Sequence, residues 1–261
     1  MSEFSCLGAG RFGVRALLTA LLVLFSIPAT GIAAESVGVT QRVQNEVVGS
    51  SGHRRLARQD PVYRSESISA GANSFGEIVL SDGARVLVGE NSKVSLDNFV
   101  VSNNSFRQAG ISVTKGAFRY ISGNSRKGAF KFRTPLSSIG VRGTVFDVYV
   151  RDLGVTDLVL LRGGVNVCGR AGGCLLVNQP CDIVRVGTNG RVTREPFLHS
   201  PERGRLEEIR QFPLTSVQWR YSPRFHAPTT VCNARAQQLR RGGDPGREQK
   251  VPEVHDDPIV D

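Results

Sequence analysis

The 261-residue sequence is poor in histidine and lacks the short motifs by which most enzymes are recognised. Its four histidines include no two spaced as a pair of metal ligands. There is no G-x-S-x-G elbow, no H-E-x-x-H zinc motif, no G-x-x-x-x-G-K-[ST] phosphate loop and no G-x-G-x-x-G turn between a strand and a helix. We therefore expect no catalytic residues, metal or cofactor. An envelope glycan-acting enzyme ranks last among the candidate functions. It stays a candidate because two carboxylates far apart in the sequence can hydrolyse a glycan without forming a recognisable motif.

Three aspartates in the strand-like region are explained by structural roles and not as catalytic acids or bases. Asp82 is explained as a turn former before Gly83, and Asp97 as a residue at a strand end. Asp147 occupies a strand position that we expect to face solvent.

Long hydrophobic runs are also scarce. The clearest, ALLTALLVLFSI at residues 16–27, follows two arginines and precedes Pro28 and a series of small residues. This pattern predicts a secretory signal peptide over residues 1–34, cleaved after Ala33 or Ala34. An uncleaved anchor is the alternative, but the run is shorter than the roughly 20 residues that a bilayer span needs. We expect a periplasmic or secreted protein that meets a membrane only through this segment, if the segment is retained.

Four cysteines follow the expected signal peptide. An even number in an exported protein indicates disulfides. Cys168 and Cys174 flank the flexible sequence GRAGG between two apolar runs, so we expect a disulfide across the open end of a hairpin. Cys181 and Cys232 would form a second pair, although four cysteines permit three pairings. Zinc is the weaker alternative, because the spacings lack the close ligand pairs that zinc usually takes.

The formal net charge is +10. Exported proteins rarely meet nucleic acid, so we expect no nucleic-acid partner and instead an envelope protein or an anionic polymer of the cell envelope. Solvated surface is the plainest explanation for much of this charge.

Strand-like segments, separated by turn residues, recur roughly every 8–12 residues and predict an all-β domain over residues 36–190. Asp82-Gly83 between two alternating apolar runs predicts a hairpin. Repeated changes of phase favour a bulged, strongly twisted sandwich or a short β-solenoid-like domain. Beyond it we expect an extension at 191–241 with one or two short helices. The segment 242–261 has too few large apolar residues to fold and is expected to be a disordered tail.

One phase change lies in TPLSSIGVRGTVFDVYV, from Thr134 to Val150. A β-bulge at Gly143 would let five apolar side chains face one core: Ile139, Val141, Phe146, Val148 and Val150. Glycine suits a bulge because it adopts positive φ freely, and Gly140 would let a backbone or large side chain approach closely. A second change of phase lies at Lys115–Gly116.

Arg142 stands beside this bend. Its guanidinium could cap carbonyl oxygens that the bulge leaves unpaired, which we favour, or it could display a fixed cation to a partner. A second candidate binding group is Trp219, Arg220 and Tyr221 in VQWRYSPRF. These residues could dock on a partner or fold back over an edge of the β domain, and the latter is slightly favoured.

The Thr134–Val150 segment resembles the signature of the FecR domain. The pattern TP…IGVRGT.F.V is carried by Thr134, Pro135, Gly140, Arg142, Gly143, Thr144 and Phe146. The resemblance extends through the hairpin at Asp82-Gly83 and through KGAFRYISG and LLRGGVNV, so it covers roughly residues 36–187. It implies an all-β domain outside the cytoplasm that works through protein contacts. FecR regulators relay the occupancy of an outer-membrane receptor to a sigma factor.

We therefore expect a non-catalytic extracytoplasmic module that binds a protein or an envelope polymer. The alternative is a sensory component of receptor-to-sigma-factor signalling, of the iron-type transmembrane kind, working with a separate membrane regulator. Only about 15 residues precede the apolar run, too few to fold a sigma-binding domain of its own.

Overall fold

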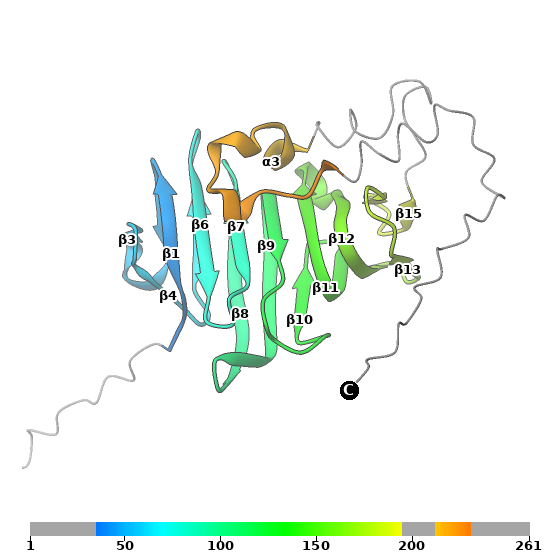
Figure 1. Cartoon of the computed structure of the whole chain (residues 1–261). Helices are drawn as coiled ribbons and strands as arrows, with labels where there is room; N and C mark the ends of the chain where they lie inside the picture. The colour runs from blue at the N-terminus through cyan, green and yellow to red at the C-terminus, as the bar shows by residue number, and fades with distance from the viewer. Residues whose placement is uncertain (1–34, 195–211, 231–261) are drawn as a thin grey trace, which may run out of the picture. The chain divides into compact units, whose positions relative to one another are not determined.

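The computed structural model describes residues 35–194 and 212–230, and these residues are mostly β-structure (Figure 1). Their strands are hydrogen-bonded into one continuous 15-stranded sheet. The strands are β1 (Ser36–Gln44), β2 (Val47–Gly49), β3 (Arg54–Arg55), β4 (Pro61–Tyr63), β5 (Ser67–Ala70), β6 (Phe75–Leu80), β7 (Arg85–Val88), β8 (Lys93–Ser102), β9 (Ser105–Ile121), β10 (Phe130–Arg133), β11 (Ser137–Val150), β12 (Thr156–Gly169), β13 (Cys174–Val177), β14 (Ile183–Val186) and β15 (Val192–Arg194). The predicted all-β class is confirmed.

Short 3₁₀ turns, η1 (Ser51–His53) and η2 (Asp152–Gly154), connect some strands. In the described part of the chain, no helix has both the length and the apolar character needed to cross a membrane. The expected signal peptide at 1–34 and the expected tail at 242–261 lie outside the described residues.

The sheet folds over into two layers because the long strands β9, β11 and β12 belong to both. The first part of β11 pairs with β10, whereas its second part, Val145–Val150, pairs with the end of β9. The start of β12 pairs with β14 and its end with β13. We call the sheet of β1, β4, β6, β7, β14 and β15 with these strand segments the first layer. The second layer contains β2, β3, β5, β8, β10 and β13 with the remaining segments.

Glycines with positive φ mark the places where the long strands bend. Gly116 in β9 has φ +80°, Gly143 in β11 has +64° and Gly163 in β12 has +82°. The β11–β12 register shifts between Arg142 and Val145, so the bulge predicted at Gly143 is confirmed. The backbones are close here: a Cβ added to Gly163 would lie 2.2 Å from the Gly143 carbonyl oxygen. Strands that pass from one layer to another commonly turn at such bulges.

The main core lies between the two layers. It contains all five apolar side chains that the bulge was predicted to bring together, Ile139, Val141, Phe146, Val148 and Val150. Aromatic rings from both layers meet in it: Tyr120 and Phe132 have centroids 4.7 Å apart, and Phe132 and Phe146 have centroids 5.1 Å apart. Because of the change of phase, the apolar side chains of β11 face the same core before and after the bend.

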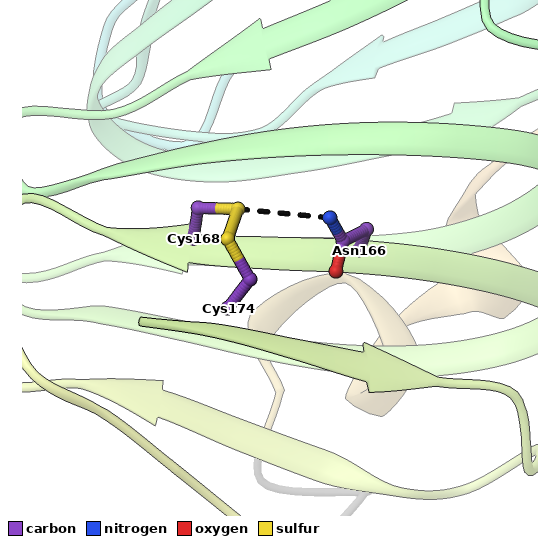
Figure 2. The surroundings of a disulfide bond; sticks show 3 residues. All are labelled: Asn166, Cys168 and Cys174. Atoms are coloured by element: carbon purple, nitrogen blue, oxygen red, sulfur yellow. Dashed lines mark hydrogen bonds between the residues drawn. A yellow bond between two sulfur atoms is a disulfide. The ribbon is translucent and has the colours of Figure 1, made fainter. Parts of the chain in front are cut away.

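A disulfide joins Cys168, near the end of β12, to Cys174, at the start of β13 (Figure 2). The two residues are paired in the β12–β13 ladder, and the Asn166 side-chain amide donates to Cys168 Sγ at 3.6 Å. The bond thus closes the hairpin turn. Cys181 is buried and also disulfide-bonded, while Cys232 lies outside the described residues.

Residues 212–230, which we call the strap, lie on the outer face of the first layer. The strap contains α3 (Pro213–Ser216), η3 (Gln218–Arg220) and η4 (Pro223–Phe225). Figure 1 shows it in orange across β6, β7 and β9. Its buried apolar side chains join a second cluster with residues of the first layer: Phe75, Leu87, Ala117, Leu214, Tyr221 and Phe225. The segment was expected to cover an edge of the domain, but it covers a face. Of the extension expected at 191–241, residues 195–211 and 231–241 lie outside the described residues.

Asp147 was predicted to face solvent, and this is wrong because the strap covers it. Its carboxylate accepts hydrogen bonds from Arg119 Nε and Nη2, both at 2.6 Å, and neither side chain is exposed. Thr215 in α3 donates to Asp147 Oδ2 at 3.0 Å, and Arg119 Nη1 donates to the Phe225 carbonyl at 3.0 Å. Strand alternation does direct Asp147 away from the main core, but it does not reveal what lies over the other face.

Replacing Gly143 with valine should destabilise the domain by about 2 kcal/mol, because a β-branched residue is forced to positive φ. Gly140→Val is the matched control, since a Cβ at Gly140 meets nothing within 4 Å and its φ is not in the left-handed region. Chemical denaturation of the two variants measures the difference. Equal stability of Gly143→Val and the wild type would show that the backbone at this bulge is not constrained as described.

Replacing Asp147 with alanine should cost about 3–5 kcal/mol of folding free energy, because Arg119 would remain buried without its counter-charge. Asp97→Ala is the control, since Asp97 is 28% exposed and its Oδ2 lies 3.5 Å from the exposed Arg133. We expect that substitution to cost about 1 kcal/mol or less. Thermal melts of both variants check the order, and a mild effect at Asp147 would contradict the buried pair.

Candidate functional site

The outer face of the second layer carries the exposed side of the Thr134–Val150 motif. In β10, Phe130 and Phe132 enter the main core, so Lys131 and Arg133 point outward. In β11, Ile139 and Val141 enter the core, so Ser138, Gly140 and Arg142, which alternate with them, lie on the outward side. We call this surface the open face and define it by Lys131, Arg133, Ser138, Gly140, Arg142 and Asn166. No described segment of the strap is hydrogen-bonded to these residues.

Glycines lie between the charged residues of the open face. Lys131 pairs with Gly140 of β11 and, on the other side, with Gly110 of β9, and Gly140 pairs with Asn166 of β12. A Cβ on Gly140 would meet nothing within 4 Å. The close approach expected at Gly140 is therefore not found. Because Gly140 has no side chain, it leaves space on the surface between the side chains of Lys131 and Arg142.

Arg142 is exposed, and within residues 35–194 and 212–230 its side chain makes no hydrogen bond or ion pair. The carbonyl oxygens flanking the bend have other donors. The Gly128 N–H donates to Val141 at 3.2 Å, and the Ser122 N–H donates to Thr144 at 3.0 Å. Arg142 does not make the predicted capping contact within the described residues, and backbone N–H groups of the 122–128 loop bond the oxygens of Val141 and Thr144. The guanidinium is presented to solvent beside a backbone that the bulge fixes.

The open face also contains a half-exposed ion pair. Asp97, which was predicted at a strand end, lies inside β8 and accepts a hydrogen bond from the Ser112 hydroxyl at 2.5 Å. Its carboxylate lies 3.5 Å from Arg133 Nη1. Arg133 is thus partly neutralised, while Lys131 and Arg142 supply the positive charge of the face.

The remaining motif residues build the structure around Arg142. Thr134 accepts a hydrogen bond from the Thr156 hydroxyl at 2.9 Å and from the Ser137 N–H at 3.1 Å. Pro135 packs against the η2 turn, where a Cβ on Gly154 would come within 2.8 Å of it. Thr144 is fully buried, and its hydroxyl has no hydrogen-bond partner in the described part of the chain.

The Asp82-Gly83 hairpin has the form that the sequence predicts. Gly83 has φ +80°, and Asp82 Oδ1 accepts the Ala84 N–H at 2.9 Å. Asp82 Oδ2 also accepts the Ser125 hydroxyl at 2.6 Å, which anchors the 122–128 loop next to the bulge. The turn residue thus also positions the loop that satisfies the bulge carbonyls.

The structure separates the second group of candidate binding residues. Trp219 is 77% exposed, whereas Tyr221 is buried and packs edge-on against Phe75 with centroids 4.9 Å apart. Burial raises the pKa of Tyr221 to about 12. The Arg220 guanidinium lies 5.9 Å from the Phe75 ring centroid. Tyr221 is therefore an anchor of the strap, Trp219 is its exposed residue, and neither shares a surface with Arg142.

Sequence reasoning missed the buried charges beneath the strap. Glu77 and Arg119 are completely buried, and each bonds to the strap. No local signal marks them, because a charged residue between apolar strand neighbours ordinarily faces water. In the described ranges, no group of three or more His, Cys, Asp or Glu side chains is placed to hold a metal ion.

The comparison with solved structures gives matches of low sequence identity. Two crystal structures of a "putative anti-sigma factor from Parabacteroides distasonis ATCC 8503" align with this chain at 19% and 18% identity, with TM-scores of 0.41 and 0.39. Each alignment covers 49% of this chain and 58% of the solved chain, so this chain spans less than two thirds of those proteins. No curated protein matches the chain.

The family model described as FecR protein matches residues 66–166. These residues run from β5 into β12 and include the bulge at Gly143, the 122–128 loop and Arg142. The resemblance seen in the Thr134–Val150 motif is confirmed. Residues 66–166 of this chain form a FecR domain.

Proposed function

We propose that this protein is a non-catalytic binding module of the cell envelope that holds an acidic partner against its open face. The observation that carries the proposal is Arg142, a cation exposed beside the bulge at Gly143, with no hydrogen bond or ion pair in the described part of the chain. The partner is an envelope protein or an anionic envelope polymer. Guanidinium groups bind carboxylates and phosphates through paired hydrogen bonds, so either class fits this chemistry.

Lys131 strengthens the case because it lies close to Arg142. Lys131 pairs directly with Gly140, and Arg142 lies two residues further along β11. Diagonal neighbours of this kind on adjacent strands are about 7–8 Å apart, so two acidic groups of one partner could be bound together. The positive net charge of the chain would also accelerate the approach of an acidic partner at low salt.

A second candidate is a sensory component that passes a signal from a receptor to a separate membrane regulator. The match of residues 66–166 to the FecR family supports it, since FecR regulators connect outer-membrane receptors to sigma factors. In that case the partner on the open face is a protein of the signalling pathway. The two candidates share one surface and differ in the identity of what it binds.

We place the protein in the periplasm or outside the cell after cleavage of residues 1–34. The run of apolar residues at 16–27 supports export, and so does the Cys168–Cys174 disulfide, because disulfides persist in oxidising compartments. The exported protein is expected to begin at Ala34 or Glu35. Intact-mass analysis of the protein from the envelope fraction tests this, and a chain that retains residues 1–34 would contradict it.

Reversing both charges with Lys131→Glu and Arg142→Glu should weaken binding at least about tenfold, because two attractive pairs become repulsive. The charge-matched control is the exposed Arg58 changed to glutamate together with Lys115→Glu, both outside the open face. The probes are vesicles containing anionic phospholipid, purified lipopolysaccharide and a solubilised extract of envelope proteins. Loss of capture from the protein extract alone would favour the sensory role.

The charge-reversed protein should keep its melting temperature, because both side chains are exposed. Full binding to every probe by this variant, or an equal loss in the control variant, would show that the open face is not the binding surface.

A further inference from the structure

Besides its buried apolar side chains, the strap is held on the outer face of the first layer by polar contacts to its main chain. Arg42 Nη1 donates to the Arg220 carbonyl at 2.8 Å, and Arg85 Nη1 donates to the Arg224 carbonyl at 3.0 Å. Arg119 makes the equivalent contact with Phe225. Three arginines from β1, β7 and β9 therefore donate hydrogen bonds to backbone carbonyl oxygens of the strap. Any polypeptide of the same conformation would present such oxygens.

Glu77 in β6 completes this pattern with the opposite polarity. Its carboxylate accepts the Ser222 N–H and the Ser222 hydroxyl, each at 2.6 Å. The side chains of Pro223 and Arg224 are exposed and take no part in these contacts. Specificity comes from the buried side chains of Leu214, Tyr221 and Phe225, with serine directly after the first ring.

The strap has little structure that could hold it in place by itself. Its only α-helix, α3, has four residues in the described part, and η3 and η4 have three each. Helical turns this short are not stable alone, so the position of the strap depends on the face that binds it.

The face itself is suited to exposure as well as to closure. Arg119 and Asp147 bind each other through two hydrogen bonds that need no atom of the strap. Once the strap leaves, water can replace the Phe225 carbonyl and the Thr215 hydroxyl, and Glu77 becomes hydrated. A permanently closed interface would gain more from apolar side chains at these positions than from buried charges. The charges thus reduce the apolar area that the uncovered face would expose, which still includes Phe75, Leu87 and Ala117.

We propose that the outer face of the first layer is a recognition site for a peptide segment with the turn-rich conformation of the strap, and that the strap fills it here in cis. A partner polypeptide with the same chemistry displaces the strap and binds there. Its sequence would have an aromatic residue, a serine directly after it and a second aromatic residue three positions after the serine. The proposal does not rest on the function of the open face, which lies on the other layer. It assigns a second and separate binding site to the protein.

While the strap occupies the site, a free peptide cannot bind. The apparent affinity for the free peptide is therefore the intrinsic affinity multiplied by the fraction of molecules in which the site is open. The test uses a fluorescent peptide with the strap sequence FPLTSVQWRYSPRFHAPT, residues 212–229, and the full-length chain. Tyr221→Ala/Phe225→Ala in the chain removes the two ring anchors of the resident strap. Fluorescence anisotropy should show the peptide binding this variant at least about tenfold more tightly than the wild type.

Two controls isolate the site. Trp219→Ala in the full-length chain removes an exposed ring and should bind the peptide no better than the wild type. A peptide carrying the same two alanine changes should not bind the Tyr221→Ala/Phe225→Ala chain. Failure of the strap peptide to bind a correctly folded double variant, or equal binding to variant and wild type, would overturn the proposal.

Hydrogen exchange of the wild-type protein decides the matter if the double variant does not fold. The Ser222 amide, which is bonded to Glu77, should exchange at least about tenfold faster than amides in the centre of β9, because the strap opens while the sheet stays folded. Exchange of the Ser222 amide only together with the β9 amides would show that the strap is a fixed part of the fold.

Discussion

A strand cannot pass from one layer of a sheet to another without interrupting its hydrogen-bond register, and glycines at positive φ absorb that interruption here. Gly116, Gly143 and Gly163 each occupy such a position in a strand that serves both layers. Gly143 and Gly163 lie against each other, so β11 and β12 bend at the same place. The two-layer arrangement, the single main core and the exposure of Arg142 all depend on this shared bend.

The bend gives the domain two outer faces that the chain treats differently. The first layer turns Glu77, Arg119 and Asp147 outward and then buries them beneath the strap. The second layer turns Lys131 and Arg142 outward among glycines and leaves them uncovered in the described structure. One face is therefore occupied by a polypeptide, and the other presents cations to solvent. Both proposals therefore assign a contact with another molecule to one of these faces, and neither needs a catalytic group.

Sequence patterns predicted what depends on local alternation and failed where distant segments meet. The alternation of Ile139 and Val141, interrupted at Gly143, was sufficient to predict both the bulge and the core it serves. The burial of Asp147 could not be predicted in this way, because its cover includes Thr215, 68 residues further along the chain. Glu77 and Ser222 are separated by 145 residues.

The role of Arg142 was misjudged for a related reason. A bulge frees carbonyl oxygens, and the adjacent guanidinium was the nearest donor in sequence. The structure supplies other donors from the 122–128 loop, which Asp82 holds through the Ser125 hydroxyl. The arginine is therefore left to the surface, and a residue that the sequence suggests is structural becomes the strongest candidate for binding.

Site-specific photocrosslinking in living cells tests the central claim most directly. A photoreactive residue at Asn166, which is exposed on the open face, should crosslink to an envelope component, whereas the same residue at the exposed Arg58 should not. The Asn166 crosslink should disappear when Lys131 and Arg142 are both changed to glutamate. Equal crosslinking from the two positions, or an Asn166 crosslink that survives the charge reversal, would contradict a partner held by the cations of the open face.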